Sequence, residues 1–210
     1  MILRNHLTGS IPNIFYVPNF ISDESERVIL RQICTSDYKW KSLSTRRLQC
    51  WGGVMGNDGF LAEPVPTWLK SICDFLVDSN IFSAEMCPNH VLINEYEAGQ
   101  GIMPHTDGPK YFPKTATLSL SSDVVMKFYL KPKNAGEVGK IPKGSVEGFL
   151  LRRLSLLVFE DEAYSGFMHG IDFAAKDDLS AVSNKESALV GQNEICERKK
   201  RISLTFRHAL

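Results

Sequence analysis

The sequence has few cysteines, no excess of charge of either sign and no long apolar run. Its five cysteines are an odd number, widely scattered and without a CxxC pair, which argues against a disulfide framework and a structural zinc site and favours a reducing compartment. Lysine plus arginine (24) balance aspartate plus glutamate (24), so no global field draws the chain onto nucleic acid or an anionic membrane. Any basic surface must therefore be local.

The first twenty residues lack the continuous apolar core of a signal peptide. No later window approaches the roughly 20 apolar residues of a membrane span. We therefore expect no membrane association and a cytoplasmic and nuclear location. The chain has 210 residues, of which 43% are hydrophobic and 23% charged, enough for one globular domain with a sizeable core. Collagen, coiled coils and wholly disordered chains are excluded by this composition.

Two helices are expected early in the chain. Ser22 is a good N-cap residue and is followed by negative charge, which predicts a helix that runs to about Cys34. Pro64 and Pro66 precede a second amphipathic pattern, in which apolar residues recur every three to four positions over 68–77. A short strand-like run at 14–17 comes before both helices.

From His90 onward the pattern changes to short β-prone runs separated by Gly, Pro and Asn turns. These runs are HVLINEY, TATLSLSS, VVMKFYL, GFLLRRLSLLVF and RISLTF. Regular short strands imply a barrel or a two-sheet jelly roll, and the earlier helices predict an α+β fold in which they buttress one sheet. Residues 172–200 are polar and have no sustained apolar period, so we expect a flexible insertion between two strands there.

His105, Asp107 and His169 are the candidate metal ligands. The first two form an HxD sequence, and in extended chain their side chains project to one face. His169, in FMHGI, is the candidate third ligand, because two histidines and one carboxylate form the facial triad of non-haem Fe(II). That triad leaves positions open for a bidentate cosubstrate and O2, whereas a structural zinc site is filled by protein. A single histidine is more often structural, so this interpretation depends on all three together.

The last strand alternates polar and apolar residues from Arg201 to Arg207, with Ser203 on the polar face. If the apolar face packs on a second layer, the polar face looks into a cavity. The planar forks of two arginines could then address opposite ends of a small dicarboxylate. The alternative is an ion-pair ladder on a solvent-exposed face. Asn94 and Tyr96 share one face of LINEY and could also hydrogen-bond a carboxylate or keto acid.

These motifs occur in a specific order, NxY, HxD, a distant HG and then RxSxTxR. In this order they resemble the AlkB family of Fe(II)- and 2-oxoglutarate-dependent dioxygenases, whose core is a double-stranded β-helix, or jelly roll. RRLQCWGG, HVLINEYEAGQGIMPHTDGPKYFPKTATLSLSS and LLVFEDEAYSGFMHGI are most similar to the subfamily called AlkB homologue six. The resemblance covers roughly residues 14–207. It implies one domain over 1–210, with helices and a substrate lid in 14–88 and the jelly roll in 89–207, interrupted by the flexible insertion.

The resemblance also implies the roles of individual residues. Iron would be bound by His105, Asp107 and His169, and the 2-oxoglutarate and inner-pocket positions would be lined by Asn94, Tyr96, Arg201, Ser203 and Arg207. Bacterial AlkB has Asn at the position of Ser203, so only the detail of that contact differs. The implied reaction uses Fe(II), 2-oxoglutarate and O2 to hydroxylate a C–H bond, and a methyl group on nitrogen is then lost as formaldehyde.

AlkB relatives use the segment before the sheet as a nucleotide-recognition lid, which here is KWKSLSTRRLQCWGG, residues 39–53. It carries Arg46, Arg47 and Trp51 and no acidic residue. Cations for phosphates and indoles for stacking would suit single-stranded or flipped-base nucleic acid. The alternative is that Trp51 anchors the core and the cations form a solvated face.

Three functions follow from these features, and the fold alone does not choose among them. They are oxidative demethylation of alkylated DNA or RNA, hydroxylation of a protein or small molecule by a dioxygenase, and non-catalytic nucleic-acid binding. The intact triad and the two arginines argue against the third, and we expect the protein to act as a monomer.

Overall fold

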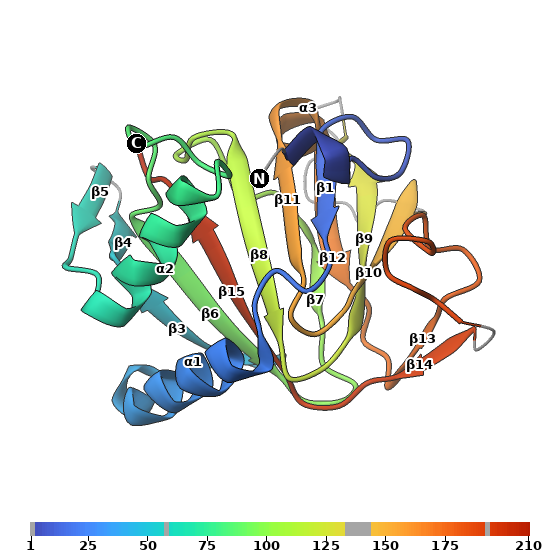
Figure 1. Cartoon of the computed structure of the whole chain (residues 1–210), viewed down its shortest axis with the longest axis horizontal. Coiled ribbons are helices and arrows are strands. Elements are labelled where there is room, and N and C mark those ends of the chain that lie inside the picture. Colours follow the sequence, from blue (N-terminus) through green and yellow to red (C-terminus); the bar gives the residue numbers. More distant parts are fainter. Residues whose placement is uncertain (1–2, 57–58, 133–143, 192–193) are drawn as a thin grey trace.

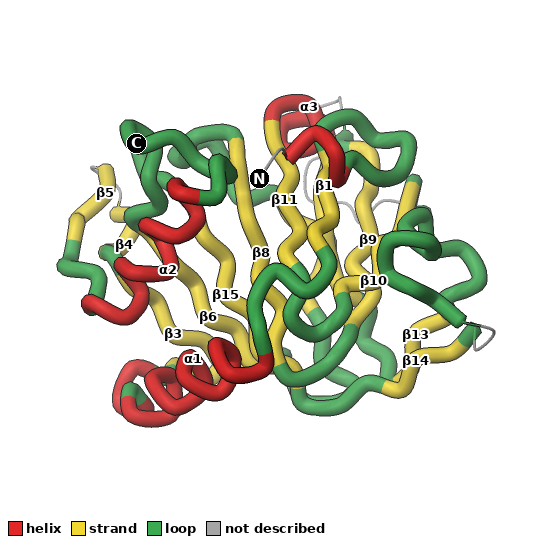
Figure 2. Tube along the Cα trace, in the orientation of Figure 1, coloured by secondary structure: helices red, strands yellow, loops and turns green. Residues whose placement is uncertain are grey.

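The computed structural model describes residues 3–56, 59–132, 144–191 and 194–210, and consists of two facing antiparallel sheets with helices on the outer side of the larger one (Figures 1 and 2). The larger sheet contains, in spatial order, β1 (Ile14–Val17), β11 (Leu156–Glu160), β8 (Lys114–Leu120), β15 (Arg201–Arg207), β6 (His90–Tyr96), β3 (Arg47–Trp51) and β2 (Lys41–Ser42). The smaller sheet contains β10 (Glu147–Leu151), β9 (Val124–Leu130), β12 (Phe167–Ile171) and β7 (Ile102–His105). This is the predicted α+β jelly roll.

Two short hairpins and the helices complete the structure. The hairpins are β4 (Gly53–Gly56) with β5 (Gly59–Ala62), and β13 (Lys176–Asp178) with β14 (Ile195–Glu197). The helices are η1 (Leu3–His6), α1 (Asp23–Thr35), η2 (Asp37–Lys39), α2 (Thr67–Asp78) and α3 (Asp161–Gly166). Within the described ranges, no helix has both the length and the apolar character needed to cross a membrane.

The two long helices begin where the sequence predicts. The Ser22 hydroxyl caps α1 by accepting a hydrogen bond from the backbone N–H of Ser25 at 3.1 Å, and α2 begins directly after Pro66. Both helices lie over the outer face of β3, β6 and β15 (Figure 1). Their apolar sides share one buried cluster with that face, including Ile33 of α1 and Leu69 of α2. Each such buried side chain contributes about 2 kcal/mol, so the helices hold the larger sheet from behind.

The alternation in β15 separates the apolar core from a polar inner face. Leu204 and Phe206 join the cluster beneath the helices, whereas Arg201 and Arg207 face the smaller sheet and are only 2% and 5% exposed. The solvent-exposed ion-pair ladder is therefore excluded. β15 lies between β6 and β8, and this register adds polar side chains of both neighbours to the same inner face.

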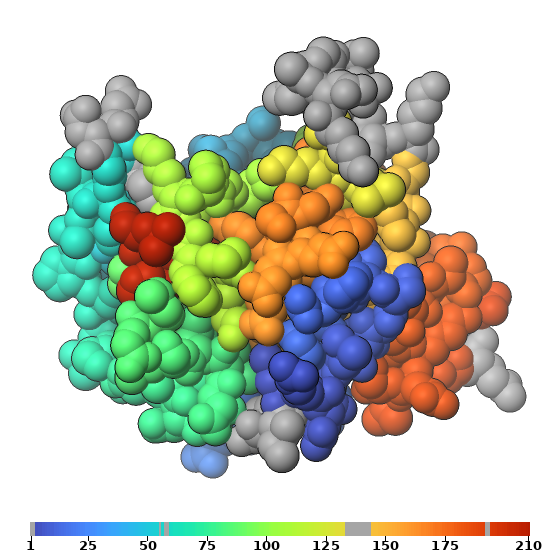
Figure 3. Space-filling view, turned by 90° about the horizontal axis from the view of Figure 1, so that it is seen from above, coloured from blue at the N-terminus to red at the C-terminus, as the bar shows by residue number. Residues whose placement is uncertain are grey.

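Residues 172–200 are packed in their described part, which corrects the expectation of a flexible insertion. The segment lies beside the N-terminal residues (orange and blue in Figure 3). Both regions are tied to Glu147, whose carboxylate accepts hydrogen bonds from Ser10 N and Ser183 Oγ. A buried ion pair joins Arg198 to Asp177 at 2.5 Å. The polar residues that suggested a solvated loop instead pair with groups elsewhere in the fold.

We expect Asn184→Ala to lower the free energy of unfolding by about 1 to 3 kcal/mol. The Asn184 amide accepts a hydrogen bond from Leu150 N at 2.8 Å and donates one to Leu150 O at 2.9 Å, and both residues are buried. The alanine variant leaves these two backbone groups of strand β10 without partners. Urea unfolding measures the effect, with Glu186→Ala, an exposed neighbour, as the control. Equal stability of the two variants would mean that the segment does not hold the sheet.

Candidate active site

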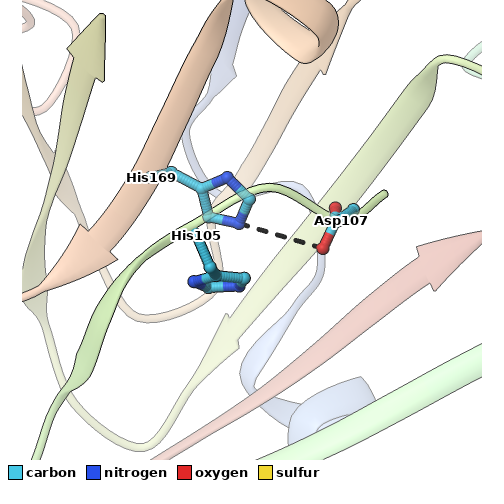
Figure 4. A group of neighbouring side chains, drawn as sticks. All are labelled: His105, Asp107 and His169. Carbon is cyan, nitrogen blue, oxygen red and sulfur yellow. Dashed lines mark ion pairs between the residues drawn. The ribbon is translucent and has the colours of Figure 1, made fainter. Parts of the chain in front are cut away.

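Three side chains that could hold a metal ion meet between the two sheets (Figure 4). His105 ends β7 and His169 lies in the middle of β12, directly opposite it in the antiparallel pairing, so their ring centroids are 4.4 Å apart. Asp107 follows two residues after β7, and its Oδ1 lies 4.0 Å from His169 Nε2. The possible ligand atoms of the three residues all lie within 4.8 Å of one another. The structure thus brings together the triad predicted from sequence.

The glycine of the HG sequence is needed for this convergence. A Cβ at Gly170 would stand 2.9 Å from both the carbonyl oxygen of Ile102 and the nitrogen of Pro104. A side chain there would push β12 away from β7, and His169 would move with its strand.

The protonation states suit a divalent cation. His105 Nδ1 lies 2.9 Å from the carbonyl oxygen of Met103 and donates to it, which leaves Nε2 as the free electron pair. Burial lowers the pKa of His105 and lowers that of His169 to about 3. Burial alone would raise the pKa of Asp107, but the charge of Arg207 and the nearby imidazoles outweigh it and hold the pKa at about 2. At neutral pH the site therefore presents two neutral imidazoles and one carboxylate.

The Asp107 carboxylate is held from both sides. Thr115 Oγ1 donates to Oδ2 at 2.7 Å, and Arg207 Nη1 donates to Oδ1 at 3.0 Å. The Arg207 guanidinium in turn lies 4.6 Å from the ring centroid of Tyr111. Partners of this kind fix the orientation of a metal ligand. With this donor set and orientation, the residues fit a non-haem Fe(II) ion.

A cavity of about 190 Å³ opens beside the triad. Its wall is formed by residues of β6, β8 and β15 of the larger sheet and of β7, β9 and β12 of the smaller sheet. The lining includes all five residues predicted to contact the cosubstrate, Asn94, Tyr96, Arg201, Ser203 and Arg207. The five residues and the triad thus line one cavity.

Arg201 is the unusual group in this cavity. Its Nη2 donates to Ser119 Oγ at 2.8 Å, but its buried Nε has no hydrogen-bond partner. Within the described ranges, no acidic side chain lies within ion-pair distance of it. Burial lowers the pKa of Arg201 to about 10, so the group is still charged at neutral pH. A buried charge without a partner is costly, and the cavity beside Arg201 is therefore suited to an anion.

The two arginines of β15, which the sequence predicts to address opposite ends of one dicarboxylate, both line the cavity but differ in their partners. Arg207 is already engaged with Asp107. The buried Nε of both arginines lacks a hydrogen-bond partner, but of the two only Arg201 has no carboxylate beside it, whereas Arg207 Nη1 is bound to the metal ligand Asp107.

Asn94 and Tyr96 present hydrogen-bond donors to the same space. The Asn94 Oδ1 accepts a hydrogen bond from Arg46 Nε at 2.9 Å, so the amide nitrogen remains to donate. Tyr96 is 6% exposed, and burial raises the pKa of its phenol, which keeps the hydroxyl protonated. Two neutral donors and one cation therefore surround the part of the cavity that faces β6 and β15.

Trp51 is a core residue, which corrects its predicted role in substrate binding. It is 6% exposed, its Nε1 donates to the Gln49 side-chain oxygen at 3.0 Å, and its ring packs edge-on against Trp68. In the register between β3 and β6, Trp51 lies opposite Val91, on the face covered by the helices. The indole is thus on the opposite side of the sheet from the cavity.

We expect Trp51→Phe to lower the free energy of unfolding by about 1 to 2 kcal/mol while 2-oxoglutarate turnover stays unchanged. Phenylalanine keeps most of the buried ring but leaves the Gln49 oxygen, which is fully buried, without its donor. Thermal melting and succinate formation are measured on the same preparation. Lost turnover with unchanged melting would restore a functional role for Trp51.

The rest of the predicted lid is also divided between two faces. Residues 47–51 form β3 within the larger sheet rather than a separate lid. Arg47 lies opposite Glu95 and pairs with it, with Nε 2.6 Å from Oε1, and its guanidinium lies 4.4 Å from the ring centroid of Trp40. Arg46, one residue earlier, lines the cavity. Of the three residues expected to contact substrate, only Arg46 faces the site.

The strand β8 contributes to the site, although its residues were not among those predicted from the sequence. Thr115, Thr117 and Ser119 alternate with apolar residues in KTATLSL and are buried on the inner face. Thr115 orients Asp107 and Ser119 binds Arg201. The period of two in this strand was a sufficient signal, because it is the same pattern as that of β15.

A jelly roll with this triad and an unpaired arginine in one cavity defines a 2-oxoglutarate-dependent, Fe(II)-dependent oxygenase. A family model described as the 2OG-Fe(II) oxygenase superfamily matches residues 51–207. The Danio rerio protein named "Probable RNA/DNA demethylase ALKBH6" is 37% identical over 201 residues, covering 94% of this chain and 86% of that protein. The chain belongs to this superfamily, and within it to the AlkB family.

More distant relatives agree with this assignment. The Macaca fascicularis protein named "tRNA (carboxymethyluridine(34)-5-O)-methyltransferase ALKBH8" is 30% identical over 211 residues, covering 93% of this chain but only 30% of that protein. The solved structure titled "The structure of OsALKBH1" has the same fold, with a TM-score of 0.62 at 15% identity, covering 95% of this chain and 100% of that one. The protein is thus a dioxygenase that uses Fe(II), 2-oxoglutarate and O2.

Proposed function

We propose that this dioxygenase removes methyl groups from alkylated nucleic acid, DNA or RNA, with Fe(II) held by His105, Asp107 and His169. The observation that carries the proposal is the buried Arg201, which has no acidic partner in the described structure and shares its cavity with a triad in the protonation state for metal binding. The name of the Danio rerio relative supports nucleic acid as the substrate class.

The side chains divide the work of binding and orientation. Arg201 would bind the carboxylate of 2-oxoglutarate that is remote from the metal, with a charge-assisted bond. Tyr96 and the amide nitrogen of Asn94 would donate hydrogen bonds to the same molecule. Ser203 lies on β15 directly opposite Asn94, and Arg201 lies opposite Tyr96. Arg207 keeps the Asp107 carboxylate turned toward the two histidines.

The bound metal, with 2-oxoglutarate and O2, supplies the oxidation of a C–H bond, and a methyl group hydroxylated on nitrogen is lost as formaldehyde. The protein contributes enclosure. Leu92, Ile102, Met126 and Ile171 add apolar surface to the cavity lining, which limits the access of water to the reacting groups. No side-chain general acid or base is required by this chemistry.

The substrate would be single-stranded nucleic acid or a base flipped from a duplex. The triad lies between two sheets, so a base stacked within a helix must leave the stack to reach it. We also propose that the enzyme acts as a monomer. We propose a cytoplasmic and nuclear location, as predicted from the sequence, because DNA and RNA occur in these compartments.

The test is turnover on a panel of modified nucleosides placed in DNA and RNA oligonucleotides. The Fe(II)-loaded protein is incubated with 2-oxoglutarate and O2, and the oligonucleotides are read by mass spectrometry. We expect loss of a methyl group together with formaldehyde and succinate. Succinate formation that is stimulated by a peptide or small molecule and never by an oligonucleotide would replace the nucleic-acid substrate with the alternative class.

A further inference from the structure

Arg46 lies between the triad cavity and a neighbouring surface cleft. It lines the triad cavity, and it also lines a surface cleft of about 390 Å³. Its position is fixed by a tight turn, in which Leu43 N donates to the Arg46 carbonyl at 2.8 Å, and by its own Nε, which donates to Asn94 Oδ1 at 2.9 Å. The half-buried guanidinium therefore lies at the mouth of the cavity and is reachable from solvent.

The other cations of the cleft are already neutralised. Arg47 pairs with Glu95 at 2.6 Å, and Lys200 lies 2.8 Å from Glu97 and 3.8 Å from Glu95. Arg46 has no carboxylate within ion-pair distance among the residues that the structure describes. It is thus the cation in this cleft whose charge is left for a ligand.

The balance of charged side chains inside the cavity also leaves Arg46 without a partner. Three guanidinium groups line it, those of Arg46, Arg201 and Arg207, against one carboxylate, that of Asp107, which pairs with Arg207. Two cations are then unpaired. Arg201 is 2% exposed and suits the buried end of the cosubstrate, whose other end belongs at the metal. Arg46, at the mouth, is the cation that remains for a second anion.

We infer that Arg46 binds a backbone phosphate of the nucleic-acid strand whose base enters the cavity, and that Arg47 does not. This inference rests on the proposed nucleic-acid substrate. A guanidinium presents a planar pair of donors that fits phosphate oxygens. Arg46 donates from Nε to Asn94 Oδ1 at 2.9 Å and from Nη1 to Thr45 Oγ1 at a long 3.4 Å, and it has no carboxylate partner in the described structure. The contact positions the strand without reading its sequence. It also ties the substrate to Asn94, and hence to the cosubstrate side of the cavity.

The test compares Arg46→Gln with two matched controls, Arg47→Gln and Lys41→Gln. Each change removes one positive charge from the same hairpin, and Lys41 is exposed and makes no ion pair in the described structure. Binding of a fluorescein-labelled single-stranded oligothymidylate, and of its RNA counterpart, is followed by anisotropy over about 50 to 200 mM salt. Melting curves confirm that each variant is folded, since Arg47→Gln leaves Glu95 with Lys200 alone.

We expect Arg46→Gln to weaken binding about tenfold at low salt and to lower the log–log salt slope by about 0.7, the value of one single-strand phosphate contact. Both controls should keep the wild-type slope. If the wild type binds and Arg46→Gln behaves like the controls, the inference is overturned and the proposed function stands. If the wild type binds neither oligonucleotide, the proposed function fails and the inference fails with it. A loss of 2-oxoglutarate affinity in Arg46→Gln, measured by calorimetry, would instead make Arg46 a cosubstrate residue and overturn the inference.

Discussion

His105→Ala is expected to abolish succinate formation and to leave the fold intact. The change removes one of three ligands from a site that has no other histidine, cysteine, aspartate or glutamate grouped with it in the described ranges. Loss of a group that only orients a metal ligand costs about 10- to 100-fold, and loss of the ligand itself should exceed that. Succinate formation and Fe(II) binding by calorimetry measure the effect.

The fold should survive because His105 makes little structural contribution. Its Nδ1 contacts only the Met103 carbonyl, which is accessible to water after the change. Circular dichroism and thermal melting check this point, and His6→Ala serves as the control for loss of an imidazole outside the site. Normal turnover in the His105 variant would rule out the triad as the metal site.

The parts of the site that the sequence predicts are those set by local geometry. The alternation from Arg201 to Arg207 defines both faces of β15, because a strand has a period of two whatever its partners are. His105 and Asp107 are close because only one residue separates them. His169 is 64 residues beyond His105, and its place depends on the pairing of β12 with β7, so the sequence names it as a ligand only through the chemistry of the triad and the family resemblance.

The errors arise where long-range pairing decides the outcome. Trp51 and Arg47 lie on the helix-covered face because of the register between β3 and β6, and composition carries no information about that register. The composition of residues 172–200 predicts a solvated spacer. In the structure, however, Asn184 accepts a hydrogen bond from a backbone N–H of β10 and Asp177 accepts one from a backbone N–H of β9, both far away in sequence. A polar residue that is paired in the interior cannot be distinguished by type from one in water.

The sequence also cannot show which charged side chains are paired in the fold. Arg201 and Arg207 are identical in a sequence pattern and differ only in their neighbours, Ser119 for one and Asp107 for the other. Because of this difference, Arg201 is available to bind an external anion, whereas Arg207 is bound to the metal ligand Asp107. It also separates the expected effects of replacing them.

Arg201→Met should raise the KM for 2-oxoglutarate by about 10- to 150-fold, the loss of about 1.5 to 3 kcal/mol for a hydrogen bond to a charged group. Fe(II) binding should not change, because Arg201 touches none of the three ligands in the described structure. Steady-state succinate formation at varied 2-oxoglutarate and calorimetric titration of Fe(II) measure the two effects separately.

The melting temperature of the Arg201→Met variant distinguishes an arginine that binds an anion from an arginine that only supports the fold. A buried ion whose partner is missing costs free energy, so an apolar side chain of similar length should leave the melting temperature of the ligand-free protein unchanged or raise it. Arg207→Met is the matched control, since it leaves Asp107 as an uncompensated buried carboxylate and should lower both stability and metal affinity. An Arg201 variant that melts early and binds 2-oxoglutarate normally would show that Arg201 supports the sheet and does not bind the cosubstrate.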